Sequence, residues 1–139
     1  AFYLLAAKCF SDLIFKPCLP MMEREGKKES KEALEEMKYL AVMMRYELEQ
    51  GDVDAFARLL NEHWEVSKKL DTGSTNTCID QIFASCEDLI DGKFISGAGG
   101  GGFLQVILKK GVSKDMLRAR LLDVYQDSGV DVWDAEFVW

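Results

Sequence analysis

In the first half of the chain, apolar residues recur at the three- and four-residue spacing that one face of a helix requires. The stretch from Phe2 to Phe15 follows this spacing and predicts a helix, which the two prolines after it would end. A second helix, capped by Glu29 or Ser30, is predicted to reach about Gln50. Its expected buried stripe consists of Leu34, Met37, Leu40 or Ala41, Met44 and Leu48.

Gly51 is predicted to end this helix, and Asp52 to begin the next, which runs from about Val53 to Leu70. The two helices would then form an antiparallel hairpin with a very short connection. The apolar side of the later helix carries Phe56, Leu59, Leu60, His63, Ser67 and Leu70, with Trp64 beside them.

A polar loop, Asp71 to Asn76, precedes a helix capped by Asn76 or Thr77 and closed by Asp91-Gly92. Its inward-facing residues are expected to be Ile79, Ile82, Phe83, Cys86, Leu89 and Ile90. Strands are predicted at Phe94-Ile95 and from Phe103 to Leu108, and the continuous apolar character of the second suggests burial on both faces.

After a Lys-Lys-Gly turn, Ser113 is predicted to cap a helix that reaches about Asp127. The side chains expected in register on its inner face are Met116, Leu117, Arg120, Leu121, Val124 and Tyr125. The segment from Val130 to Trp139 is predicted to be a final strand, with Val130, Val132 and Phe137 as core candidates.

These elements predict an α+β fold in which a helical hairpin and further helices pack on a small, mostly antiparallel sheet. With 139 residues and 48% hydrophobic content, the chain fits a single domain over residues 1–139. The net charge of −7 argues against nucleic-acid binding, which needs clustered Lys and Arg. We find no membrane helix and no secretory leader, and we expect a cytoplasmic protein that does not bind a membrane.

Residues that commonly bind metals are sparse. The four cysteines, at positions 9, 18, 78 and 86, match no zinc spacing, and we interpret them as reduced thiols. His63 is the single histidine, so it cannot form a metal site by itself, and a packing role is favoured over general-base work. We therefore expect no metal site in this chain.

Five of the eleven glycines lie between Gly97 and Gly102. Because glycine lets other groups approach its N–H closely, such a run can bind an anion, form a tight turn or pack against another domain. The run matches neither the Walker pattern, which ends in Gly-Lys-Ser/Thr, nor the dinucleotide pattern, which opens a helix. An apolar strand follows it here.

The segment Ser96-Gly97-Ala98-Gly99-Gly100-Gly101-Gly102-Phe103-Leu104 resembles the third conserved motif of the GHMP kinases, which include galactokinase, homoserine kinase, mevalonate kinase and phosphomevalonate kinase. The resemblance covers about residues 50 to 139. Within the family, the run Leu59-Leu60-Asn61-Glu62-His63-Trp64-Glu65-Val66-Ser67-Lys68-Lys69-Leu70-Asp71-Thr72-Gly73 is similar to L-fucokinases and to bacterial heptose 7-phosphate kinases. The choice between these branches, or a galactokinase-type domain, stays open.

The resemblance implies ATP-dependent phosphorylation of a sugar hydroxyl, either of L-fucose or of a heptose phosphate, with Mg²⁺ in the full-length enzyme. The family's phosphate loop and acidic base lie in an N-terminal domain, and no loop of the type Pro-x-x-x-Gly-Leu-x-Ser-Ser occurs here. The chain begins with Ala1-Phe2-Tyr3 rather than with Met. We interpret it as the C-terminal domain of such a kinase, without the ATP-binding domain, and expect the isolated piece to be inactive.

On the cofactor side, the resemblance points to Gly97, Ala98, Gly99, Gly100, Gly101 and Gly102, which would pack against the phosphate loop and offer N–H groups to phosphate. On the sugar side it points to Trp64, Lys68, Asp71 and Ser96. An aromatic face suits the C–H face of a sugar, and charged groups suit its hydroxyls. The structural alternatives are glycines that only permit domain packing, Trp64 in the core, and lysines on a solvated face near Glu65.

Two other classes of function fit the pattern. One is a stand-alone regulatory or small-molecule-binding module whose glycine turn binds an effector anion. The other is a structural domain that supplies an interface, with an exposed apolar patch around Phe94, Phe103 and the first helix. A kinase would expose the same patch to its N-terminal domain. A phosphate loop encoded upstream of Ala1 would favour the kinase, and a start codon there would favour the module.

Overall fold

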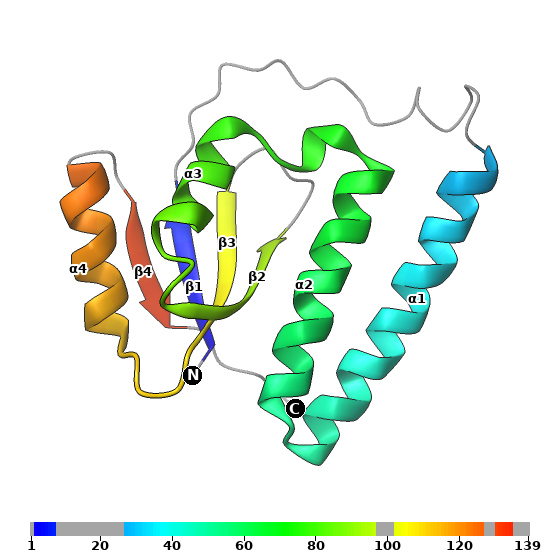
Figure 1. The fold of residues 1–139 in the computed structure, drawn as a ribbon, viewed down its shortest axis with the longest axis horizontal. Coiled ribbons are helices and arrows are strands. Elements are labelled where there is room, and N and C mark those ends of the chain that lie inside the picture. The colour runs from blue at the N-terminus through cyan, green and yellow to red at the C-terminus, as the bar shows by residue number, and fades with distance from the viewer. Residues whose placement is uncertain (1, 8–26, 97–101, 127–129, 135–139) are drawn as a thin grey trace.

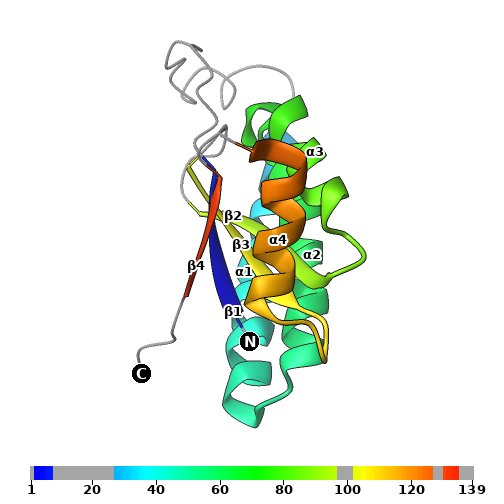
Figure 2. The same ribbon diagram turned by 90° about the vertical axis from the view of Figure 1, so that its left-hand side faces the viewer.

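A computed structural model describes residues 2–7, 27–96, 102–126 and 130–134. The elements are β1 (Phe2–Ala7), α1 (Lys27–Gln50), α2 (Val53–Leu70), the 3-10 turn η2 (Thr72–Ser74), α3 (Thr77–Ser85), β2 (Ile90–Ser96), β3 (Gly102–Leu108), α4 (Lys114–Tyr125) and β4 (Asp131–Asp134). The strands form one antiparallel sheet in the order β2-β3-β1-β4 (Figure 1). Helices α3 and α4 cover one face of the sheet, and the α1–α2 hairpin lies beside β2 (Figures 1 and 2). The predicted α+β fold is confirmed.

The first element is a strand, so the helix predicted from Phe2 is wrong over the part that the structure describes. β1 pairs with β3 on one side and with β4 on the other, and Leu4 lies opposite both Gln105 and Trp133. Six apolar residues suit a central strand as well as they suit a helix, so periodicity does not separate the two, and the pairing on both sides decides. Residues 8–26, which include the rest of that prediction and both prolines, lie outside the described part.

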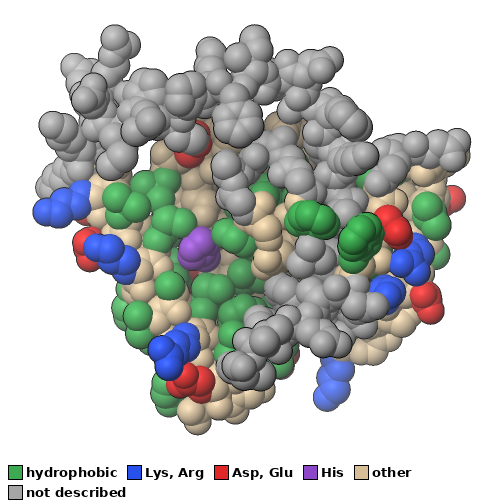
Figure 3. All heavy atoms as spheres, turned by 180° about the vertical axis from the view of Figure 1, so that it is seen from behind, with side chains coloured by type: hydrophobic (Ala, Val, Ile, Leu, Met, Phe, Trp, Pro, Cys, Tyr) green, Lys and Arg blue, Asp and Glu red, His purple; other side chains and the backbone are tan. Residues whose placement is uncertain are grey.

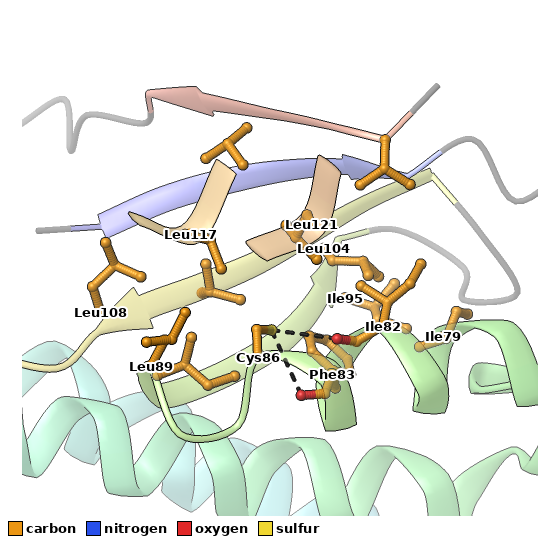
Figure 4. Close-up of a cluster of buried hydrophobic side chains, with 14 of the residues drawn as sticks. Ile79, Ile82, Phe83, Cys86, Leu89, Ile95, Leu104, Leu108, Leu117 and Leu121 are labelled. Atoms are coloured by element: carbon orange, nitrogen blue, oxygen red, sulfur yellow. Dashed lines mark hydrogen bonds between the residues drawn. The ribbon is translucent and has the colours of Figure 1, made fainter. Parts of the chain in front are cut away.

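The main core lies between the sheet and the helices α3 and α4 (Figure 4). On β3, Leu104, Val106 and Leu108 face this core, and Leu117 and Leu121 face it from α4. The remaining buried members are Trp64, Ile79, Ile82, Phe83, Cys86, Leu89, Ile90, Ile95, Val130 and Val132. All six residues that are predicted to face inward after the polar loop are therefore buried, although Cys86, Leu89 and Ile90 lie beyond the end of α3.

Cys86 is a buried, reduced thiol of this core. It donates weak hydrogen bonds to the carbonyl oxygens of Ile82 at 3.3 Å and Phe83 at 3.6 Å (Figure 4). Burial raises the pKa of the thiol to about 11, which keeps it protonated and unreactive. Cys78 is also free. For both residues, the prediction of reduced thiols is confirmed.

Three helix starts that the sequence predicts from polar residues are present, whereas the predicted start of α1 is wrong, because this helix already begins at Lys27 and contains the expected caps Glu29 and Ser30. The side chains of Asp52, Asn76 and Ser113 each accept a hydrogen bond from the backbone N–H three residues later, at 2.8, 3.0 and 3.2 Å. These bonds satisfy backbone donors that have no partner inside the helix. Gly51 closes α1 with a φ of 76°, a conformation that favours glycine.

Four details of the predicted packing are corrected. Helix α3 ends at Ser85 and strand β2 begins at Ile90, so the predicted helix is too long and the predicted strand too short.

On α1, Leu34 is 40% exposed and Ala33 is buried instead, because α1 packs on α2 along a narrow stripe. On α4, Met116 and Val124 are each 50% exposed, since this helix covers only the sheet below it. Phe103 is 42% exposed, so β3 is not buried along its whole length on both faces. Phe137 lies outside the described residues.

Strand β2 and helix α2 approach each other closely at Gly92. A Cβ on Gly92 would lie 3.1 Å from the Cα and 3.2 Å from the carbonyl oxygen of Ala57. Beside this contact, the Asn61 side chain donates to the carbonyl of Asp91 at 2.7 Å and accepts from the N–H of Lys93 at 2.9 Å. Asn61 therefore pairs with the outer edge of β2 as a neighbouring strand would.

We predict that Gly92→Ala lowers the free energy of unfolding by about 1–3 kcal/mol, because the added methyl group meets the α2 backbone and cannot rotate away. Urea unfolding of the chain measures this loss. Gly51→Ala is the comparison, since nothing lies within 4 Å of that position and its cost comes only from the backbone conformation. An unchanged free energy of unfolding in Gly92→Ala would show that α2 and β2 are not packed as described.

Candidate functional site

A cavity of about 210 Å³ lies where α1, α2 and β2 meet. Its lining residues are Met37, His63, Trp64, Ser67, Leu70, Asp71, Ser74, Phe94 and Ile95. Figure 3 shows the single histidine among hydrophobic side chains on this side of the molecule. Ile95 is followed by Ser96, the last residue of β2 and the first of the glycine motif. The cavity therefore adjoins the start of that motif.

Three aromatic rings, those of His63, Trp64 and Phe94, are among the side chains that line the cavity. The ring of Phe94 contacts His63 edge-on, with centroids 4.8 Å apart, and lies perpendicular to Trp64 at 6.2 Å. Trp64 is only 2% exposed and also contacts Phe83, with ring centroids 6.2 Å apart. Trp64 is thus both a core residue and part of the cavity lining. Its position agrees with both interpretations from the sequence, packing in the core and contact with a sugar.

The polar side chains of the cavity are oriented by local hydrogen bonds. The Ser67 hydroxyl donates to the His63 carbonyl at 2.9 Å, one helical turn back. The Ser74 hydroxyl donates to the Ser67 carbonyl at 3.3 Å, and an Asp71 carboxylate oxygen accepts from the N–H of Gly73 at 2.8 Å. The polar loop after α2 is therefore folded back over the end of that helix.

His63 lies in the wall of the cavity as a neutral side chain. Its Nδ1 is buried without a hydrogen-bond partner. Burial also lowers the pKa of the imidazole below its usual value, because the surroundings disfavour the charged form. The sequence predicts its packing role but not the cavity. The sequence signal for the cavity is the spacing of residues 63, 67, 70, 71 and 74, which puts them on one face of the helix and of the loop that follows it.

The residues predicted on the sugar side are only partly brought together. Trp64 and Asp71 line the cavity. Lys68 lies outside the lining, with its Nζ 5.6 Å from the centre of the Trp64 ring and 2.6 Å from the Glu65 carboxylate. Ser96 accepts a hydrogen bond from the Gln105 side chain on the neighbouring strand. Their role toward a ligand stays a prediction.

The residues predicted on the cofactor side lie mostly outside the described structure. Gly102 opens β3, and Ser96, the last residue of β2, pairs with Phe103 beside it. Gly97, Ala98, Gly99, Gly100 and Gly101 are not among the described residues. Their contact with phosphate is therefore untested and also stays a prediction.

Part of the expected apolar patch is present. Phe103 is 42% exposed and Trp133 is 55% exposed, and their ring centroids lie 6.1 Å apart. Both side chains point away from α3 and α4, because Leu104 and Val132 next to them face the core. Phe94 lines the cavity rather than this patch.

The described residues contain no group of three or more His, Cys, Asp or Glu side chains that could hold a metal ion. Within the same residues, no helix is both long and apolar enough to cross a membrane.

The family described as GHMP kinases C terminal matches residues 44–127, more than half of the chain. An L-fucokinase/L-fucose-1-P guanylyltransferase of Bacteroides fragilis is 36% identical over 76 residues, 55% of this chain and 8% of that protein. A bifunctional fucokinase/GDP-fucose pyrophosphorylase of Arabidopsis thaliana is 32% identical over 82 residues, 59% of this chain and 8% of that protein. The chain thus spans only a small part of the length of these relatives.

Two solved structures share the fold. Mevalonate kinase of L. major in complex with R-mevalonate superposes with a TM-score of 0.75 at 14% identity, over 99% of this chain and 43% of that protein. A second mevalonate kinase gives a TM-score of 0.53 at 18% identity, over 95% of this chain and 38% of the other. These identities are low, so the likeness concerns the fold.

We predict that His63 makes the stability of the chain fall between about pH 7.5 and about pH 5.5. Because the folded protein disfavours imidazolium, the unfolded chain binds the proton more readily. The His63 contribution is full above the unfolded pKa of about 6.5 and decreases as the pH falls toward the folded pKa.

The measurement is the free energy of unfolding at both pH values, for the wild-type chain and for His63→Gln. Glutamine keeps a polar side chain with good helix propensity but does not titrate. The variant should show the smaller decrease, whatever its absolute stability. Equal decreases in the two proteins would mean that His63 titrates normally in the folded state.

Proposed function

Because the chain belongs to the GHMP kinase C-terminal family, we propose that it supplies one wall of the active site of an ATP-dependent sugar kinase of the fucokinase type. The observation that carries the proposal is the position of the cavity. Ile95 lines it and Ser96 begins the glycine motif. A sugar held in the cavity would therefore lie next to the segment that the family resemblance assigns to phosphate. The names of the two sequence relatives, both fucokinases, support L-fucose as the sugar.

Phosphoryl transfer requires a held triphosphate, a screened charge and an aligned acceptor oxygen. Gly97 to Gly102 would pack against the phosphate loop of an N-terminal domain and present N–H groups to the transferred phosphate. The role of this chain is to position the sugar and to support the phosphate loop.

On the sugar side, the proposed roles fall to residues that line the cavity or lie beside it. Asp71 would accept hydrogen bonds from sugar hydroxyls, while the rings of Phe94 and Trp64 would contact sugar C–H groups. Lys68 would act from beside the cavity, since its Nζ lies 5.6 Å from the centre of the Trp64 ring. Ser96 would stand between sugar and phosphate at the end of β2.

We expect the protein that carries this chain, as encoded with all residues that flank it, to transfer phosphate from ATP to the anomeric hydroxyl of L-fucose. Phosphorus NMR of the reaction mixture identifies the sugar 1-phosphate. The isolated 139-residue chain should transfer none, because it contains no phosphate loop. If the full protein phosphorylates no sugar, the proposal is contradicted and a binding module is left. If the isolated chain transfers phosphate, the assignment of the phosphate loop to another domain is contradicted.

Within the full protein, Gly100→Val should lower kcat/KM for ATP-dependent phosphorylation by about tenfold or more, which corresponds to about 1.4 kcal/mol. A branched side chain at this position would keep the phosphate loop or phosphate away from the backbone N–H groups. Gly51→Ala, in the turn between α1 and α2, is the control and should leave kcat/KM unchanged. Wild-type kinetics in Gly100→Val would remove the glycine motif from the active site.

A further inference from the structure

Strand β3 carries one polar side chain, that of Gln105, among residues that are otherwise apolar from Phe103 to Leu108. Gln105 is half-buried and lies on the face of the sheet opposite to Leu104 and Val106, which belong to the main core. An amide that is withdrawn from water costs free energy unless it forms hydrogen bonds. The amide of Gln105 therefore calls for a reason other than packing.

Gln105 forms a hydrogen bond to Ser96 across the β2–β3 pair. Phe94 is the partner of Gln105 in this pair and Phe103 is that of Ser96, so the two polar side chains are diagonal neighbours on one face. The side-chain nitrogen of Gln105 donates to Ser96 Oγ. Because Ser96 follows Ile95, which lines the cavity, the bond fixes the serine hydroxyl beside the cavity and at the start of the glycine motif.

The direction of this hydrogen bond determines what the Ser96 hydroxyl can do. An amide nitrogen only donates, so Ser96 Oγ is the acceptor and its own hydrogen points away from Gln105. The serines of the cavity differ, because the hydroxyls of Ser67 and Ser74 donate their hydrogens to backbone carbonyl oxygens. A hydroxyl that accepts an N–H is also a stronger donor, since hydrogen bonds in a chain polarise one another. Ser96 is therefore oriented as a hydrogen-bond donor.

A phosphate oxygen is the acceptor that matches such a donor best. Hydrogen bonds to an anion are about twice as strong as those between neutral groups. A sugar hydroxyl both donates and accepts, so it would not require a serine that is oriented in one direction. In the proposed function, Ser96 lies where the sugar cavity meets the phosphate segment. The orientation of its hydroxyl favours the phosphate side.

We propose that Gln105 is a positioning residue, which orients the Ser96 hydroxyl so that Ser96 donates a hydrogen bond to the terminal phosphate of ATP. Gln105 itself does not touch ATP, and Ser96 keeps its proton during phosphoryl transfer. The proposal rests on the proposed kinase function. It adds to that function the residue that orients the donor and the group that receives the hydrogen bond.

The first test is made in the full protein, as encoded with all residues that flank this chain. Gln105→Met keeps the side-chain length and suits an apolar strand, but it cannot donate to Ser96. It should lower kcat/KM for ATP by about tenfold and leave the KM for the sugar unchanged, because the lost contact concerns phosphate. Gln50→Met is the matched control and should keep the wild-type kinetics, since Gln50 lies near Asp91, at the start of β2 and away from Ser96.

Ser96→Ala tests whether Gln105 acts through Ser96. This variant should lower kcat/KM for ATP at least as much as Gln105→Met does. In the Ser96→Ala background, Gln105→Met should then change kcat/KM by less than about twofold, because two residues that act through one contact are not additive. Equal losses from Gln105→Met with and without the Ser96 hydroxyl would show that Gln105 acts independently, which overturns the proposal.

Gln105→Glu reverses the hydrogen bond at nearly unchanged side-chain size. A carboxylate only accepts, so it would take the Ser96 hydrogen away from phosphate. Its charge would also repel phosphate, and the Ser96→Ala background measures that repulsion alone. The loss in kcat/KM for ATP should therefore be larger by about fivefold or more when the Ser96 hydroxyl is present. Equal losses in the two backgrounds would mean that the direction of the bond is irrelevant, and they overturn the proposal.

Equilibrium binding gives a readout that does not depend on turnover. The ATP analogue AMP-PNP carries a terminal phosphate that is not transferred, whereas ADP lacks this phosphate. In calorimetric titrations of the full protein, Gln105→Met should raise the Kd of AMP-PNP by about threefold or more and leave the Kd of ADP unchanged. Thermal unfolding of each variant verifies its fold.

The outcomes separate this proposal from the kinase function. Wild-type kinetics in both folded single variants, Gln105→Met and Ser96→Ala, overturn the proposal while the kinase function stands. A raised KM for the sugar with an unchanged kcat/KM for ATP, or equal weakening of AMP-PNP and ADP binding, overturns it as well. If the wild-type protein phosphorylates no sugar, the kinase function and this proposal are overturned together.

Discussion

The close packing of α2 on β2 is the constraint on which the site depends. Gly92 lets the strand backbone come within contact of Ala57, and Asn61 fastens the same strand through two backbone hydrogen bonds. The rest of α2 then extends along the sheet edge and brings His63 against Phe94. A side chain at Gly92 would push the helix outward and open the space that now closes around a small cavity. The size of the cavity therefore depends on Gly92, the smallest residue in the strand, which lies about one helical turn or more away from the cavity.

Local signals in the sequence predict local structure well here. Asp52, Asn76 and Ser113 each start a helix through a bond to a backbone N–H three residues away, so nothing distant is needed to recognise them. The strand Phe2–Ala7 is different, because its state is decided by two partners near the other end of the chain. The end of α3 differs from the prediction for a related reason. Leu89 and Ile90 continue the apolar pattern of the helix, but they do so from a turn and a strand.

The candidate site shows the same division. The family resemblance led to Trp64 and Asp71, which lie in one short run of sequence and do line the cavity. Met37 and Phe94 complete it from another helix and from a strand, and no pattern in a single sequence places them together. Lys68 was predicted from its charge, yet its neighbour Glu65 holds it at the surface. Chemistry can be predicted where the residues share one segment, whereas the shape of the cavity requires the assembled fold.

The position of β1 in the middle of the sheet has a consequence for how the protein is made. β4 is joined to the sheet only through β1, and β1 pairs with β3 from the opposite end of the sequence. During synthesis, β1 precedes both of its partner strands, so its two edges stay unpaired until β3 and β4 have followed. Contacts between such distant segments form slowly, and an apolar strand with open edges can pair with other chains in the meantime. Protection of Phe2–Ala7 by a chaperone or by a neighbouring part of the polypeptide would therefore raise the yield of folded protein.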